Sequence, residues 1–259
     1  MNTFSKYRAA ASVASIGVIL SLAACGGGGG GGGSSDTTAN PNAGGPPQTV
    51  SGTVAKGAAL AGAAVSMTCA NGAVLGGTTS ATGGYTTAAV SIAYPCIGTA
   101  VAAGGSPSYR GVMFSGGVAN FSPLTDMLVQ TVLAASATGS ASLSLAEFVT
   151  KMSTDATFST NVSAPANVTA LRTVVLDTIR KELSATKTPA EITLILAAAA
   201  TFDATPFVVG SPLDMVLDNT AAVLQNADGS LKTAILAIVK IAADVLPVPP
   251  SRATGATGS

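Results

Sequence analysis

The chain has 259 residues, of which 47% are apolar and only 9% charged, and its formal net charge is zero. An average soluble domain carries roughly 25% charged residues, and a chain without a basic excess cannot hold a phosphate backbone, so we expect no nucleic-acid partner. Histidine is absent, which removes the commonest general base and metal ligand and excludes most Ser–His–Asp, Cys–His and zinc-hydrolase mechanisms. We therefore expect no catalytic residue, no metal site and no cofactor.

Residues 1–24 have the features of an export signal. Lys6 and Arg8 precede an apolar stretch, 9–22, that is too short for a comfortable membrane span. The tetrapeptide LAAC that ends at Cys25 resembles the lipobox of bacterial lipoproteins. This resemblance implies a signal peptide over 1–24 and a lipidated Cys25, with a diacylglyceryl group and palmitate among the expected acyl chains. The alternative is an ordinary secretory signal followed by an incidental cysteine.

Residues 25–47 follow as a predicted tether. Eight glycines, Gly26 to Gly33, lead into a run of Ser, Thr, Asn and Pro that ends at Pro47. Such a segment cannot bury apolar surface, so we expect a flexible coil with a mean reach of roughly 25 Å. The lipid bilayer is thus a predicted partner through acylated Cys25. Gly26 after the cysteine resembles the outer-membrane sorting signal of Gram-negative lipoproteins, with the periplasmic and surface leaflets both left open.

Residues 48–120 have the pattern of an antiparallel β-sandwich. Apolar and polar residues alternate in predicted strands, and Asn71-Gly72 and the turn at Thr82-Gly83-Gly84-Tyr85 separate some of them. The predicted strands are 49–55, 63–69, 85–92, 97–103 and 109–115. Short strands separated by Gly-rich turns are typical of sandwiches.

Three motifs in this region resemble the carboxypeptidase regulatory-like (transthyretin-like) β-sandwich. They are Ser51-Gly52-Thr53-Val54, Leu60-Ala61-Gly62-Ala63-Ala64-Val65 and Thr82-Gly83-Gly84-Tyr85-Thr86. The resemblance implies a non-catalytic module that accompanies enzymes, transporters and surface proteins. The acidic residue that is usual in the last motif is missing, so we expect no cation there.

Cys69 and Cys96 remain once Cys25 is lipidated. Two cysteines near strands of an exported domain predict a disulfide, which would close a loop of about 28 residues and stabilise the fold by roughly 3 kcal/mol. A redox or metal role would need a third ligand or a C-x-x-C spacing, and neither is present.

Residues 121–247 are predicted to be mainly helical, and 248–259 to form a disordered tail. The expected helix N-caps are Ser122, Ser144, Asn167, Thr188 and Ser211, and Ser144 and Thr188 begin capping boxes. The predicted helices that follow Ser122 and Ser211 both begin with the sequence Ser-Pro-Leu. This repetition reflects either a duplication or the repeated use of one capping motif. Residues 226–229 predict a turn without calcium, because Ile235 stands where a calcium loop needs Glu. Residues 231–241 fit a strand or a helix.

Few residues offer catalytic chemistry. Ser184-Ala185-Thr186-Lys187 matches the S-x-x-K of penicillin-binding enzymes, but the S-D-N and K-T-G motifs are missing. Two carboxylates would suffice for a glycosidase, and the candidates are Asp126, Asp177, Asp203, Asp214 and Asp218. Asp214 and Asp218 are one helical turn apart and are predicted to share a face. Their simpler interpretation is favourable charge near a helix N-terminus together with solvation.

The predicted fold class is α+β: an N-terminal antiparallel β-sandwich followed by a mainly α-helical domain. Lipobox, glycine run, sandwich and helices in this order resemble a group of Gram-negative lipoproteins. We expect a lipid-anchored envelope protein without catalytic activity that acts in binding or envelope assembly, with an envelope protein, peptidoglycan or an extracellular ligand as partner. The alternatives are a carboxylate-dependent envelope hydrolase or its accessory subunit, and a structural spacer between the outer membrane and the cell wall.

Overall fold

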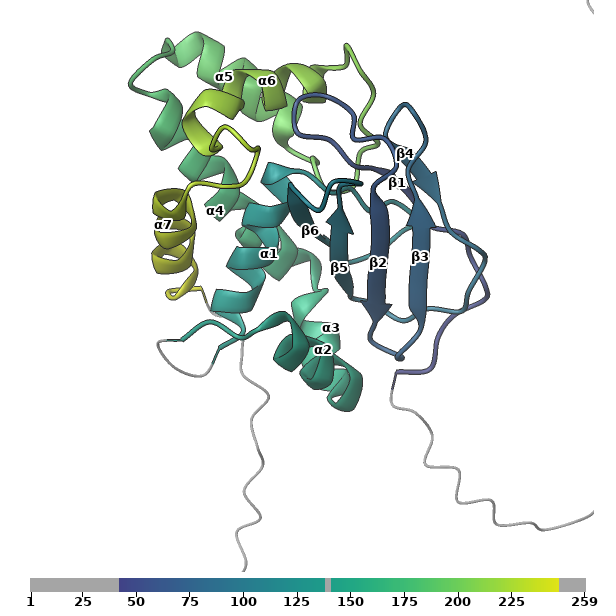
Figure 1. Ribbon diagram of the computed structural model, residues 1–259. Helices are drawn as coiled ribbons and strands as arrows, with labels where there is room; N and C mark the ends of the chain where they lie inside the picture. The colour runs from purple at the N-terminus through teal and green to yellow at the C-terminus, as the bar shows by residue number, and fades with distance from the viewer. Residues whose placement is uncertain (1–41, 138–140, 247–259) are drawn as a thin grey trace, which may run out of the picture. The chain divides into compact units, whose positions relative to one another are not determined.

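The structure is a computed structural model that describes residues 42–137 and 141–246. Antiparallel strands come first in the chain and helices follow, so the fold is mixed α and β in the predicted order (Figure 1). The strands are β1 (Ser51–Thr53), β2 (Ala64–Cys69), β3 (Val74–Thr78), β4 (Gly84–Thr86), β5 (Cys96–Val101) and β6 (Ser108–Met113). The helices are α1 (Pro123–Ala135), α2 (Leu145–Thr154), α3 (Ala156–Val162), α4 (Pro165–Leu183), α5 (Pro189–Ala199), α6 (Pro212–Leu224) and α7 (Thr233–Ala243).

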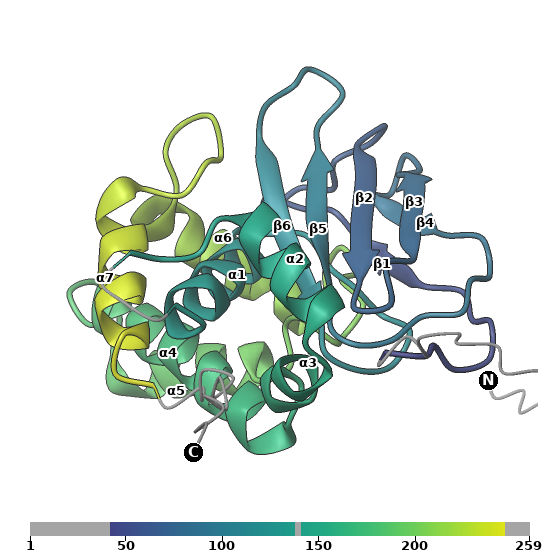
Figure 2. The same ribbon diagram turned by 90° about the horizontal axis from the view of Figure 1, so that it is seen from below.

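The strands form two small antiparallel sheets among the described residues. The larger has the order β3-β2-β5-β6, and the smaller pairs β1 with β4. The hairpin between β2 and β3 turns at Asn71-Gly72, as predicted, and Gly72 adopts a positive φ of 80° that a side chain would disfavour. The helices gather on the β6 side of the larger sheet, and β3 lies farthest from them in both views (Figures 1 and 2).

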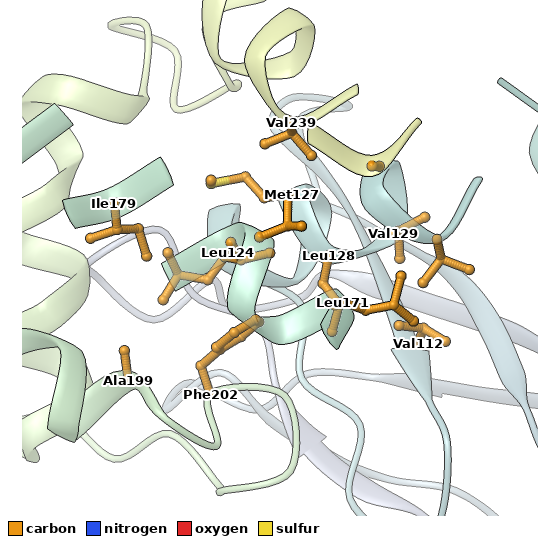
Figure 3. Packing of buried hydrophobic residues seen from close by; sticks show 14 of the residues in the cluster. Val112, Leu124, Met127, Leu128, Val129, Leu171, Ile179, Ala199, Phe202 and Val239 are labelled. Carbon is orange, nitrogen blue, oxygen red and sulfur yellow. The ribbon is translucent and has the colours of Figure 1, made fainter. Parts of the chain in front are cut away.

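The buried apolar residues form two clusters, and both clusters include residues of the strands. One cluster joins both sheets and includes Met67, Tyr85 and Phe121. The other joins Ile97 of β5 and Val112 of β6 to the helices, and Figure 3 shows Val112 beside helical residues of this cluster. Side chains alternate across a strand, so the larger sheet contributes one face to each cluster. The finer expectation of a β-sandwich followed by a separate helical domain stays a prediction.

Local capping explains where most helices begin. Ser122, Ser144, Thr188 and Ser211 cap α1, α2, α5 and α6 as predicted, each accepting a hydrogen bond from a backbone N–H in the first turn. The prediction that Asn167 is an N-cap is wrong, because α4 already begins at Pro165, whose fixed φ suits the first helical turn. The Asn167 side chain instead donates to the Asn161 carbonyl at 2.6 Å.

Three further segments differ in detail from the sequence patterns. The strand expected over 85–92 is short, since β4 ends at Thr86 and only an isolated bridge joins Val90 to Gln48. The ambiguous stretch 231–241 is mainly helical, as α7. The packed chain begins inside the segment expected to be tether, because Asn42 is buried and donates to the Met152 carbonyl at 2.9 Å.

Buried hydrogen bonds connect the strand region to the helices. The side chain of Asn120 joins the Thr53 amide to the carbonyls of Phe202 and Thr205. The Tyr109 hydroxyl donates to the Gly229 carbonyl at 2.7 Å. These bonds span 67 to 120 residues of sequence, so they hold the helices against the strands in one arrangement.

Candidate functional site

The structure joins Cys69 to Cys96, the two cysteines that the sequence paired. They lie opposite each other on the neighbouring strands β2 and β5 and form a disulfide across 27 residues of sequence. Both side chains are fully buried in the cluster between the two sheets. The bond therefore belongs to the core and offers no exposed redox group. Cys25, the predicted lipidation residue, lies outside the described residues.

Asp126 in the first turn of α1 is held by Arg110 of β6. Its Oδ1 accepts hydrogen bonds from the side-chain Nε and the backbone amide of Arg110. The same guanidinium donates to Gln130 Oε1 at 3.2 Å, one turn further along α1. This carboxylate thus fastens α1 to the edge of the larger sheet.

Asp203 is almost fully buried and forms a two-pronged ion pair with Arg172 of α4. Arg172 Nε and NH2 each donate to one carboxylate oxygen at 2.8 Å. Both residues line a small hollow of about 230 Å³ between the segment that follows β6 and the start of α4. Because both oxygens of Asp203 are engaged and its charge is neutralised, this carboxylate is a structural group.

Asp177 pairs with Arg180 one turn later on α4, and both side chains are more than half exposed. Exposed pairs of this kind contribute little to stability.

Asp214 and Asp218 lie on α6, as the spacing predicted, but in different surroundings. Asp214 is only 8% exposed, and its Oδ2 accepts from the Gly210 amide at 2.7 Å, beside the N-cap Ser211. Its Oδ1 is buried and has no hydrogen-bond partner among the described residues. Asp218 is exposed. The structure therefore does not bring the two carboxylates into one enclosed cleft.

Ser184 and Lys187, the S-x-x-K match, lie in the connection between α4 and α5. The Ser184 hydroxyl donates to the Lys181 carbonyl at 2.6 Å, and the residue is exposed at the end of α4. The serine is therefore engaged in ending a helix.

Tyr85 and Tyr109 are buried, and their hydroxyls bond to backbone carbonyls. The hydroxyl of Tyr85 donates to the Ala119 carbonyl at 2.7 Å, and burial raises its pKa. Burial also raises the pKa of Tyr109, and the nearby carboxylates of Asp126 and Asp228 raise it further. Both hydroxyls stay protonated and act as hydrogen-bond donors inside the fold.

Grooves lined by residues 42–137 and 141–246 offer further candidates for binding, and three of them are described here. The first, called here the α4–α7 groove, measures about 640 Å³ and is lined by Ala170, Thr173, Val174, Asp177, Thr178, Lys181, Ile238, Ile241, Ala242, Val245 and Leu246. The second, the α5–α6 groove, measures about 260 Å³ and includes the exposed side chains of Leu194 and Met215. A third, of about 850 Å³, lies between residues 43–48 and the junction of α3 and α4.

Sequence reasoning missed the ion pairs and the grooves. For the ion pairs Arg110–Asp126 and Arg172–Asp203, the sequence contained one indication. Charged residues are scarce in this chain, and Arg110 lies inside a predicted strand. A charge placed in such a segment must find a partner or reach water. For the grooves the sequence contained no such indication, because they depend on how helices from separate parts of the chain meet.

Comparison of the chain with protein-family models, with curated proteins and with solved structures found no match. Across residues 42–137 and 141–246, no helix has the length and apolar character needed to cross a bilayer. The same residues contain no group of three or more acidic, cysteine or histidine side chains placed to hold a metal ion.

Proposed function

We propose that this chain is a cell-envelope protein of the outer membrane, anchored by lipid on Cys25, that acts by binding or in envelope assembly and not by catalysis. Its partner would be an envelope protein, peptidoglycan or an extracellular ligand.

The use of the three cysteines is the observation that carries the proposal. Cys69 and Cys96 are joined in a buried disulfide, a bond that persists in oxidising compartments such as the periplasm. Cys25 is the third cysteine of the chain, and it follows a basic N-terminal stretch, an apolar run and the LAAC tetrapeptide. The disulfide supports export to an oxidising compartment, and the lone cysteine at the end of an export signal supports acylation.

The engagement of the carboxylates favours binding over hydrolysis. Asp126 and Asp203 are paired with partly buried arginines, and Asp177 is paired on the surface. A glycosidase needs one protonated and one ionised carboxyl that face each other across a cleft. Arginine side chains already engage Oδ1 of Asp126 and both carboxylate oxygens of Asp203, so neither carboxyl group is free to face a substrate across a cleft.

The fold interpretation belongs to the same proposal. We infer that residues 48–120 are a module similar to the carboxypeptidase regulatory-like β-sandwich. The two antiparallel sheets that share one apolar cluster support this inference. A module of that kind would present the helical part at the cell envelope without supplying chemistry of its own.

The decisive experiment is intact-mass analysis of the protein extracted from bacterial membranes. The expected result is a chain that starts at Cys25 and carries diacylglyceryl and acyl groups, with a Cys25→Ser variant recovered unlipidated. A mature chain that starts elsewhere and carries no lipid would refute the anchor. Protease shaving of intact cells then separates the two leaflets, since peptides from beyond Gln48 are released only if the folded part faces outward.

One observation keeps the hydrolase as a second candidate. Asp214 Oδ1 is buried without a hydrogen-bond partner among the described residues, which is costly unless something outside the chain pairs with it. Turnover of a cell-wall polysaccharide by the purified protein, lost in Asp214→Asn, would support this candidate and refute the binding proposal. Co-sedimentation with peptidoglycan without turnover would instead identify the cell wall as the partner.

A further inference from the structure

Helix α7 is apolar around most of its circumference, yet it packs on the rest of the chain along one side only. Its sequence is TAILAIVKIAA, and its buried residues are Ile235, Val239 and Ala243. Ile241 is 69% exposed, and Val245 just beyond the helix is 81% exposed. A helix that is apolar all round is normally buried all round, so its outer face calls for a cover that the described residues do not provide.

The α4–α7 groove makes this face a continuous apolar surface. Val174 of α4 and the side chains of Ile238 and Leu246 line it together with Ile241 and Val245. These apolar side chains adjoin one another, unlike the scattered single apolar residues that are normal on protein surfaces.

Two carboxylates at or beside the groove are paired, whereas a lysine that lines it is not. Asp177 at its rim is neutralised by Arg180, and Asp244 beside it is neutralised by Lys240. Lys181, which also lines the groove, makes no ion pair among the described residues. An apolar surface with one uncompensated lysine at its edge matches an interface of acyl chains and phosphate headgroups.

The position of the groove in the chain argues for the same partner. The described chain ends at Leu246, which lines the groove, and it begins at Asn42, which is bonded to Met152 of α2. In Figure 1, α2 and the end of α7 both lie below α5 and α6, which are at the top. About 17 residues separate Asn42 from Cys25. A chain segment of this length spans at most about 60 Å.

We propose that the α4–α7 groove docks on the surface of the bilayer that holds the acyl chains of Cys25. This proposal rests on the proposed lipid anchor. Ile241 and Val245 enter the boundary between headgroups and acyl chains, Lys181 contacts a lipid phosphate, and α7 lies in the membrane plane. Because the anchor keeps the groove near the membrane, docking is effectively intramolecular and needs only a weak intrinsic affinity. The docked protein would present α5 and α6 away from the membrane.

The absence of tryptophan from the chain allows a direct test. Val245→Trp places a single tryptophan at the groove, and Leu194→Trp places one on α5, where the native residue is similarly exposed, at 72%. Each lipidated full-length variant is reconstituted in vesicles of phosphatidylethanolamine and phosphatidylglycerol that contain phospholipid brominated on its acyl chains. The expected result is a blue-shifted emission and strong quenching for the Val245→Trp variant, and neither change for the Leu194→Trp variant.

A second pair of variants measures the energy of docking. Ile241→Asp in the Val245→Trp background removes an aliphatic side chain that docking buries, so the docking equilibrium should fall by about tenfold or more. Leu194→Asp in the same background adds the same charge to an equally exposed helical site and should leave the quenching unchanged. Vesicles of phosphatidylcholine alone lack the net negative charge of phosphatidylglycerol, so the weaker attraction to Lys181 should reduce docking by about fivefold. Circular dichroism checks that each variant is folded.

The outcomes separate this proposal from the anchor on which it rests. If mass analysis of the same preparation finds no lipid on Cys25, the proposed function is refuted. If Cys25 is acylated and the Val245→Trp variant is not quenched, the anchor stands and the docking is wrong. A blue shift that depends on protein concentration, without quenching by brominated lipid, would mean that a second copy of the chain covers the groove, and it would also overturn the docking proposal.

Discussion

The Asn120 side chain allows a quantitative test of how the strands and helices are held together. Asn120 is 3% exposed, and its Oδ1 accepts from the Thr53 amide at 3.2 Å. Its Nδ2 donates to the carbonyl oxygens of Phe202 and Thr205 at 3.0 and 2.5 Å. Asn120→Ala removes all three hydrogen bonds and leaves a buried amide and two carbonyl groups without this partner. At about 1 kcal/mol for each bond, the free energy of unfolding should fall by roughly 3 kcal/mol.

The assay is urea unfolding of the full-length protein, followed by two signals. Circular dichroism at the helical band reports α1 to α7, and tyrosine fluorescence reports the strand region, because Tyr85, Tyr94 and Tyr109 all precede the first helix. Asn219→Ala is the matched control, since Asn219 donates only to the Met215 carbonyl on the surface of its own helix. The control should change the unfolding free energy by less than about 0.5 kcal/mol.

Two results would refute the reasoning. A loss of less than about 0.5 kcal/mol in Asn120→Ala would mean that these buried bonds do not hold the helices on the strands. Transitions that do not coincide for the two signals would mean that residues 48–120 unfold as a separate domain, since a single cooperative unit gives one transition by every probe.

Three further predictions concern the disulfide, a close backbone contact and the helix caps. Reduction of the Cys69–Cys96 bond, or its removal in Cys69→Ala/Cys96→Ala, should lower the unfolding free energy by about 3 kcal/mol, because a bond that closes a loop of this size restricts the unfolded chain. An unchanged midpoint of chemical denaturation would contradict this argument from chain entropy. Gly52→Ala places a Cβ at 1.7 Å from the Ala119 carbonyl oxygen, so β1 must move. We expect a loss of about 1–3 kcal/mol or more, and a thermal midpoint equal to that of the native protein would show that the backbone yields without cost. Hydrogen bonds from Ser144 and Thr188 lower the pKa of Glu147 and Glu191 in the folded protein. The stability that these two caps add is therefore fully present above the ordinary glutamate pKa of about 4.3. It is lost as the pH falls through the lower pKa values of the folded protein. Thermal unfolding of Glu147→Gln/Glu191→Gln across this acid range should show a weaker pH dependence than the native chain, and identical profiles would contradict the assignment.

Short-range features of this protein could be predicted from its sequence. The caps at Ser122, Ser144, Thr188 and Ser211 were predicted because a cap joins residues only three positions apart. The turn at Asn71-Gly72 was predicted for the same reason, since positive φ depends on the residue itself. The cysteine pair followed from counting cysteines in an exported chain. The predicted lipid anchor at Cys25 comes from the sequence alone, because it lies outside the described residues.

Tertiary structure decided which partners the charged and apolar groups acquired. Asp203 and Arg172 are 31 residues apart, and they meet only because the segment after α5 packs against α4. Asn167 matched a capping residue locally, but Pro165 began the helix earlier. The stretch 231–241 fitted a strand or a helix by pattern, and its packing as α7 against α1 and α4 fits the helical form. The α4–α7 groove exists because these helices meet along one side only, and this contact depends on long-range packing that no local pattern records.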